Sequence, residues 1–143
     1  MSAFQNSVSG FGLGAGSPAA EPQVLLYHFP MDDRTRMLRR FLRKSGIAVR
    51  MVEAPEFLHP LGYLFGIPGF TPCPQFNMGG NFQEEMMVIG NLSGAQTDAL
   101  LDFFHSNKLA PVQLKAVLTP ITSHWSSLKL YEELSREHRA MKK

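Results

Sequence analysis

The chain contains one hydrophobic pattern twice, and this limits its fold more than any other feature. Residues 24–52 and 87–115 align when one segment is shifted by 63 positions. Each segment has an apolar run typical of a strand, a polar turn, an amphipathic stretch of helical period and a second apolar run. The pattern predicts two βαβ units. The matched apolar pairs are Leu38 with Leu101, Phe41 with Phe104, Val49 with Val112, and Met51 with Leu114.

Capping signals place the start of both helices. Asp32 or Asp33 can cap the first helix, and Gly46 can end it. Ser93 and Gln96 have the spacing of a capping box before the second helix. The expected elements are strands over 24–29, 48–53, 85–92 and 112–119, helices over 32–45 and 93–108, and a final helix from about 126 to the end.

Two βαβ units with right-handed crossovers predict an α+β domain of ferredoxin-like topology, β-α-β-β-α-β. In that fold a four-stranded antiparallel sheet carries both helices on one face. The alternative is a small doubly wound α/β domain with parallel strands. The added C-terminal helix could cover the open face of the sheet, cover a sheet edge or serve a partner, and its apolar side consists of Leu128, Tyr131, Leu134 and Met141.

The length of 143 residues fits one folded domain. Residues 1–22 are rich in Gly, Ser and Ala and carry no charge before Glu21, which predicts a flexible leader. Residues 23–143 are then a single α+β domain. No apolar run approaches the ~20 residues of a membrane-spanning helix, so no membrane association is expected.

Residues 54–83 form an insert between the two units. The insert contains five prolines, five glycines and five phenylalanines, and a short helix is expected over 60–65. It is too apolar for a solvated linker and too often interrupted for a long helix. Long ordered connections in compact domains are often functional. The insert is therefore either a lid over the sheet or a binding element.

The first helix holds most of the positive charge. Residues 32–44 include six basic and two acidic side chains, a net charge of +4, whereas the remaining chain has a net charge of −2. This face could bind phosphate, an RNA backbone or an acidic protein, or it could simply be solvated. Its basic residues are Arg36, Arg39, Arg40, Arg43 and Lys44.

Residues 88–104 resemble the opening of an RNA-recognition motif. Those modules stack bases on aromatic side chains of two central strands. Here the first of these strands offers Met86, Met87, Val88 and Ile89, and residues 117–120 lack the aromatic pattern of the second. RNA binding by this route is therefore not favoured.

Neither metal nor cofactor chemistry has a motif in the sequence. The five histidines form no HxH or HxxxH pair, and a single cysteine, Cys73, excludes an internal disulfide and any CxxC motif. We therefore expect no metal and no cofactor, and the single cysteine fits a reducing compartment. An enzyme would need a pocket between the insert and the sheet, with His28, His59, Cys73 and Thr119 as its polar groups.

The C-terminal part resembles a small bacterial family that is catalogued only as a domain of unknown function. The pattern comprises Lys115-Ala116-Val117-Leu118-Thr119-Pro120, Trp125, Leu130, Glu133-Leu134 and Glu137-His138. The family often has asparagine two residues after the proline, where this chain has Thr122, so a polar role there is in doubt. The resemblance implies a fold and a cytoplasmic location but no activity.

These observations favour a non-enzymatic binding or assembly module with a protein partner or a second copy of itself. Nucleic-acid or phosphate binding through the first helix and a small enzyme are the alternatives. Function is expected where the two units differ: the arginine face, the insert and the segment that leads into the last helix. The candidate binding residues are Arg36, Arg39, Arg40, Arg43, His59, Thr119 and Trp125.

Overall fold

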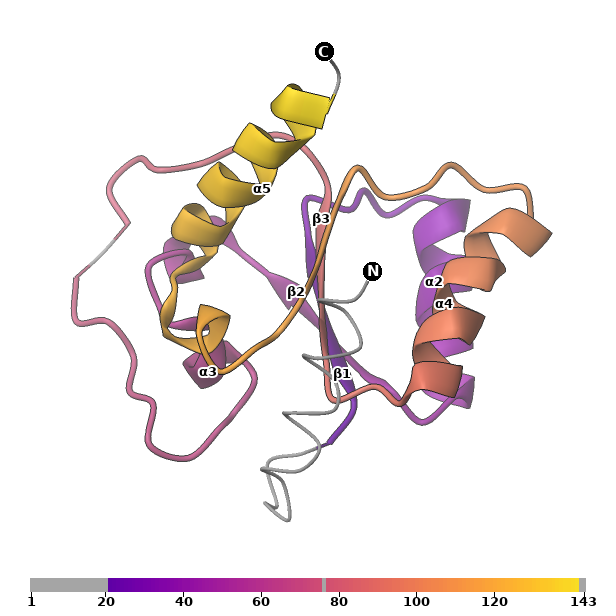
Figure 1. Ribbon diagram of the computed structural model, residues 1–143, viewed down its shortest axis with the longest axis horizontal. Coiled ribbons are helices and arrows are strands. Elements are labelled where there is room, and N and C mark those ends of the chain that lie inside the picture. The colour runs from indigo at the N-terminus through magenta and orange to yellow at the C-terminus, as the bar shows by residue number, and fades with distance from the viewer. Residues whose placement is uncertain (1–20, 76, 142–143) are drawn as a thin grey trace.

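A four-stranded sheet lies between two helical layers in the computed structural model, which describes residues 21–75 and 77–141 (Figure 1). Residues 1–20 of the expected leader, and the side chain of Met141, lie outside this part. The elements are β1 (Gln23–Tyr27), α2 (Asp33–Lys44), β2 (Ala48–Val52), the 3₁₀ turn η1 (Ala54–Glu56), α3 (Leu61–Leu64), β3 (Met86–Gly90), α4 (Gly94–Ser106), β4 (Leu114–Val117), the 3₁₀ turn η2 (Thr122–His124) and α5 (Ser127–Met141).

The sheet has the strand order β2-β1-β3-β4 and is mixed. β1 pairs with β2 and β3 pairs with β4 in parallel, while β1 and β3 are antiparallel. A mixed α and β fold is confirmed, whereas the fully antiparallel sheet was a wrong prediction and the ferredoxin-like topology is not confirmed. The reason is that the two strands of each unit are direct neighbours in the sheet. Because a crossover helix connects them, they run parallel. The antiparallel central pair also departs from the doubly wound alternative.

The two units meet around an approximate two-fold relationship. Leu25 and Val88 are partners in the antiparallel register, and these two residues also correspond under the shift of 63 positions. His28 and Asn91 correspond in the same way, and both have positive φ, 60° and 64°. Each strand therefore enters its helix through a similar turn.

The shift that relates equivalent residues of the two βαβ units changes along the chain, so part of the predicted alignment was wrong. The buried helical residues correspond with a shift of 62: Leu38 matches Leu100, not Leu101, and Phe41 matches Phe103. The second strand–helix connection is thus one residue shorter. Ala48 and Leu114 occupy equivalent register positions, so Val49 does not match Val112, because the connection after α4 is longer.

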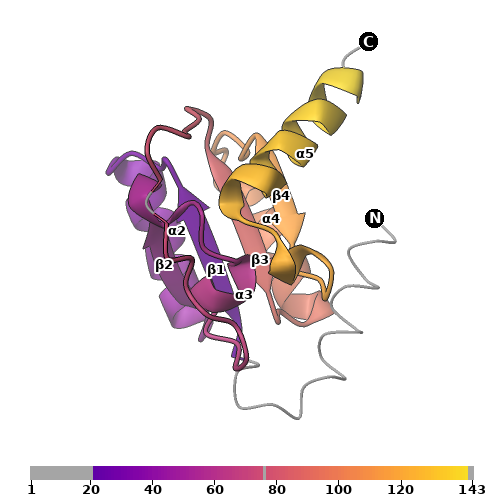
Figure 2. The ribbon, with the colours of Figure 1, turned by 90° about the vertical axis from the view of Figure 1, so that its left-hand side faces the viewer.

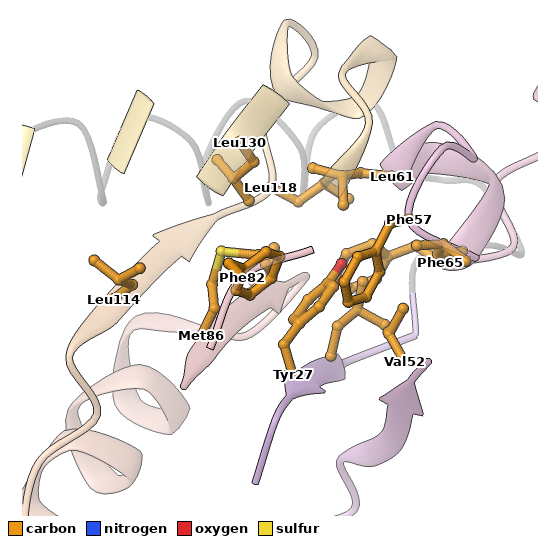
Figure 3. Packing of buried hydrophobic residues seen from close by; sticks show 13 residues of the cluster. Tyr27, Val52, Phe57, Leu61, Phe65, Phe82, Met86, Leu114, Leu118 and Leu130 are labelled. Atoms are coloured by element: carbon orange, nitrogen blue, oxygen red, sulfur yellow. The ribbon is translucent and has the colours of Figure 1, made fainter. Parts of the chain in front are cut away.

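Both faces of the sheet are covered, which explains why the central strands are apolar without alternation. β3 is buried throughout, as is β1 after Gln23. On one face α2 and α4 pack on a core of Val24, Leu26, Leu38, Leu42, Met87, Ile89, Leu100 and Phe104. On the other face α3, α5 and the insert pack on Leu25, Tyr27, Phe57, Leu61, Phe82, Met86, Leu114 and Leu130 (Figure 3).

The insert and α5 together close the second face. The expected short helix is present as α3, which buries Leu61 and Leu64. Backbone hydrogen bonds join the insert to the start of α5: the Leu61 amide donates to the Trp125 carbonyl at 2.8 Å, and the Ser127 amide donates to the Phe57 carbonyl at 3.1 Å. Of the three roles considered for the last helix, covering the open face is the one seen. Within the described residues, no helix has the length and apolarity to cross a membrane.

Candidate functional site

The basic side chains of α2 after Arg34 lie on the side of the helix away from the sheet. Asp32 caps the helix by accepting the Thr35 amide at 2.9 Å, and this hydrogen bond lowers the pKa of Asp32. Leu38 and Leu42 are buried against the sheet. Arg43 and Lys44 lie in the last turn, where positive charge suits the helix dipole.

The basic side chains form two rows along α2, and each row borders a different hollow. Arg40 and Lys44 line a groove of about 490 Å³ between α2 and α4. Arg39 and Arg43 line a hollow of about 390 Å³ beside the start of β2. The single arginine face expected from the sequence is thus divided between two surfaces.

Most of these cations have no counter-ion among the residues that the structure describes. Arg36 is paired with Asp33 and also donates to the Met31 carbonyl at 3.2 Å. The side chains of the other four form neither an ion pair nor a hydrogen bond with any residue that the structure describes: Arg39, Arg40, Arg43 and Lys44. Their charge is therefore available to a ligand.

The groove between α2 and α4 has an apolar floor. The rings of Phe41 and Phe103 are stacked with centroids 4.7 Å apart, and Met37 is 36% exposed beside them. The opposite rim includes Asp102, which accepts the Ser106 hydroxyl at 2.8 Å. The groove thus combines a cationic rim, an apolar floor and a rim that is polar and acidic.

Base stacking on the sheet, as in an RNA-recognition motif, is not available to the described strands. β1 and β3 lie beneath helices on both faces, and their central residues Leu25 and Val88 are fully buried. Any nucleic acid would have to bind to the outer helical surfaces instead.

The remaining predicted site residues lie on the other side of the sheet, in the layer of α3 and α5. The Nδ1 atom of His59 accepts the Cys73 amide at 2.9 Å. The Thr119 and Thr122 hydroxyls lie 3.1 Å apart, and the Thr119 amide donates to the Thr122 hydroxyl at 2.8 Å. The Trp125 ring lies under the Lys129 ammonium at 5.4 Å. His59, Thr119 and Trp125 therefore do not join the arginines in one site.

The four polar groups of the enzyme hypothesis do not line any of the three hollows described in this section. His28 is hydrogen-bonded to Asn81 at 3.0 Å, whereas His59 and Cys73 contact each other. None of them, nor Thr119, lines the two hollows above or the cavity described next. Among the described residues, no group of three or more His, Cys, Asp or Glu side chains could hold a metal ion.

One polar cavity was missed by sequence reasoning. It has a volume of about 240 Å³ and lies between Glu84, which follows the insert, the start of β4 and one side of α5. Its residues come from three separate segments, which no linear motif reveals. The only available signal was the helical spacing of the α5 members. The lining residues are Glu84, Gln113, Leu114, Tyr131, Ser135, His138 and Arg139.

Comparison with known proteins gives one family match. A family model described as a domain of unknown function (DUF3783) matches residues 85–141. This segment comprises β3, α4, β4, η2 and α5, so the resemblance noted in the C-terminal part is confirmed. The first βαβ unit and the insert lie outside the match. Neither a curated protein nor a solved structure matched the chain.

Proposed function

We propose that this protein is a non-enzymatic binding module that holds an acidic segment of a protein partner on the α2–α4 surface. The observation that carries the proposal is the position of unpaired cations beside an apolar groove. Arg40 and Lys44 have no carboxylate partner among the described residues, and they border the stacked rings of Phe41 and Phe103. Such a surface suits a ligand that is both apolar and acidic.

The composition of the groove favours a protein over a nucleic acid. A phosphate backbone would satisfy the cations but would leave the apolar floor exposed to water. Asp102 is exposed on α4 and would repel phosphates at the opposite rim, and the exposed Asp98 on the same helix adds to the negative charge of α4. Phe41 and Phe103 stack on each other, so their facing surfaces are not open to bases.

An amphipathic helix is the partner that matches this geometry. A helix in a groove places apolar side chains at helical spacing on the floor and its charged side chains on the rims. Its acidic residues would face Arg40 and Lys44, which lie one turn apart on α2. Arg39 and Arg43 border the other hollow and would add only long-range attraction.

The cellular setting is part of the same proposal. The single Cys73 suits a reducing cytoplasm, and the bacterial origin rests on the family resemblance alone. We interpret the two corresponding βαβ units as an internal repeat in which only the first unit has acquired the basic face.

The proposal is tested with a labelled helical peptide that carries leucines on one side and glutamates along the other. We expect anisotropy titrations with the full chain to show binding that weakens as ionic strength rises from low salt to about 0.15 M. The double variant Arg40→Glu/Lys44→Glu should bind at least about tenfold more weakly, a difference of about 1.4 kcal/mol. The matched control Arg39→Glu/Arg43→Glu has the same charge change and should lose much less.

Other outcomes would select the alternatives. Tighter binding of a single-stranded RNA oligonucleotide than of the peptide, lost in both double variants, would replace the protein partner with a nucleic acid. Equal losses for the two double variants would reject the groove as the site. Light scattering on the unliganded chain tests self-association, and a dimer abolished by Arg40→Glu/Lys44→Glu would identify a second copy as the occupant.

A further inference from the structure

The polar cavity beside α5 lies on the opposite side of the sheet from the α2–α4 surface. Figure 2 shows α5 running across this side of the sheet, next to β4. The cavity has a volume of about 240 Å³ and is the most enclosed of the three hollows described. Such a volume suits a ligand of a few heavy atoms, and the charges of the lining residues indicate which kind.

One wall of the cavity is negatively charged. The Glu84 carboxylate accepts the Tyr131 hydroxyl at 3.0 Å and the Gln83 amide at 3.2 Å, in both cases through Oε1. Burial alone would raise the pKa of Glu84, but hydrogen bonds from its own amide, from Tyr131 and from Gln83, together with the charge of His28, outweigh burial and hold the pKa below its ordinary value. Burial and the Glu84 carboxylate raise the pKa of Tyr131, so the phenol remains the donor. Oε2 accepts no hydrogen bond from another described residue and can accept one from a ligand.

The end of α5 contributes basic residues to the lining of the cavity, His138 and Arg139. The Arg139 guanidinium uses one nitrogen, Nη1, to donate to the Ser135 hydroxyl at 3.3 Å. It forms no ion pair with any carboxylate in the described part of the chain, and neither does His138. The remaining guanidinium N–H groups can therefore serve an anionic ligand.

We propose that this cavity binds a small zwitterion of the α-amino acid class. The ligand ammonium would donate to Glu84, and its carboxylate would accept from Arg139 and His138. Glu84 and Arg139 line one cavity without pairing with each other, which is the arrangement that a short bridging ligand with both charges completes. The apolar side of the cavity includes Leu114, which suits an amino acid with a small aliphatic side chain.

The test uses the full ¹⁵N-labelled chain and four probes: glycine, alanine, acetate and methylammonium. We expect the two amino acids to shift amide resonances around Glu84, Gln113 and residues 131–139. Each amino acid should bind at least about tenfold more tightly than either single-charge analogue, because both charges are met at once. Resonances of α2 and α4 should not move, which separates this site from the proposed protein-binding surface.

Two variants and one control assign the charges. Glu84→Gln keeps an oxygen that accepts the Tyr131 hydroxyl, so the cavity should persist while glycine binds about tenfold more weakly and acetate binds unchanged. Arg139→Gln should weaken both glycine and acetate. Arg136 lies on the same helix but pairs with Glu133 outside the cavity. Arg136→Gln should therefore change the binding of neither glycine nor acetate. Glycine binding that is absent at about 10 mM, or unaffected by Glu84→Gln and Arg139→Gln, would overturn the proposal.

Discussion

Phe41 and Phe103 stack on each other with ring centroids 4.7 Å apart and an interplanar angle of 25°. They occupy equivalent positions in the two helices, so the same position of each βαβ unit meets its counterpart. This contact joins α2 to α4 on the outer side of the layer and forms the floor of the candidate groove.

The stacking predicts a measurable coupling between the two rings. Phe41→Ala and Phe103→Ala should each destabilise the protein, and together they should cost less than the sum of the single losses by about 0.5–1.5 kcal/mol. Urea unfolding of the two single variants and the double variant gives this coupling. Phe41→Ala combined with Phe70→Ala serves as the control, since Phe70 contacts His124 in the other layer and should behave additively. Additivity of the Phe41/Phe103 pair itself would contradict the prediction.

Arg34 connects the two units at one end of the sheet. Its guanidinium donates to Glu85 at 2.7 Å and to the Ala110 carbonyl at 2.9 Å, and both partners of the ion pair are mostly buried, with side chains 14% and 23% exposed. Arg34→Met should lower the free energy of unfolding by about 1–3 kcal/mol, because Glu85 is left without its partner.

Two further variants separate the charge effect from general damage. Arg34→Met/Glu85→Met should recover part of the loss, since no unpaired carboxylate remains. Arg36→Ala removes an exposed ion pair with Asp33 from the same helix and should leave chemical unfolding nearly unchanged. Equal destabilisation by Arg34→Met and Arg36→Ala is the result that contradicts the assignment.

Features that depend on local chemistry were predictable from the sequence. The Ser93 hydroxyl accepts the Gln96 amide at 3.1 Å, and the Gln96 side chain accepts the Ser93 amide at 2.9 Å, as the capping-box spacing indicated. Asp32 caps α2 for the same local reason. The concentration of basic side chains on α2 was also readable from the sequence, whereas their division between two surfaces was not.

Features that depend on pairing between distant segments were not predictable. The sequence of a strand does not determine which strands will be its neighbours in the sheet. The parallel placement of β2 beside β1 and of β4 beside β3 therefore could not be predicted from the pattern. The groove requires α4 beside α2, and the polar cavity beside α5 has Glu84 and Arg139 in its lining although they are 55 positions apart in the sequence. The sequence also does not reveal the contacts of His59 and Trp125: the His59 ring accepts the Cys73 amide, and the Trp125 carbonyl accepts the Leu61 amide.

Gly90 leaves space that the insert fills. A Cβ atom at this position would lie 2.5 Å from the ring of Phe65, which is itself buried. Gly90→Ala should therefore destabilise the protein by about 1–3 kcal/mol, through a displaced ring in the second core. Gly94→Ala is the matched control: it meets nothing within 4 Å and replaces a glycine in the first turn of α4, so it should be neutral or slightly stabilising. Thermal or urea unfolding of the two variants checks the contrast, and equal effects would show that the ring moves freely.

The buried hydroxyl of Tyr27 leads us to expect that the free energy of unfolding falls at alkaline pH. Its hydroxyl is buried 2.6 Å from the Ser127 hydroxyl, and burial raises the pKa of Tyr27 above its ordinary value of 10.0. Above about pH 10 the unfolded chain loses this proton while the folded protein keeps it, so the unfolded state binds fewer protons and stability falls by up to about 1.4 kcal/mol per pH unit for this group.

The effect of removing the Tyr27 hydroxyl on the free energy of unfolding should depend on pH. Tyr27→Phe should cost about 1 kcal/mol at pH 7, because Ser127 loses its buried partner, and the difference from the wild type should shrink or change sign above about pH 10. Urea unfolding at a series of pH values measures this directly, with Tyr63→Phe as a control that removes a hydroxyl from a partly buried ring of the insert. A stability difference for Tyr27→Phe that stays constant from pH 7 into the alkaline range would mean that the Tyr27 phenol ionises equally easily in both states, which its burial in the core argues against.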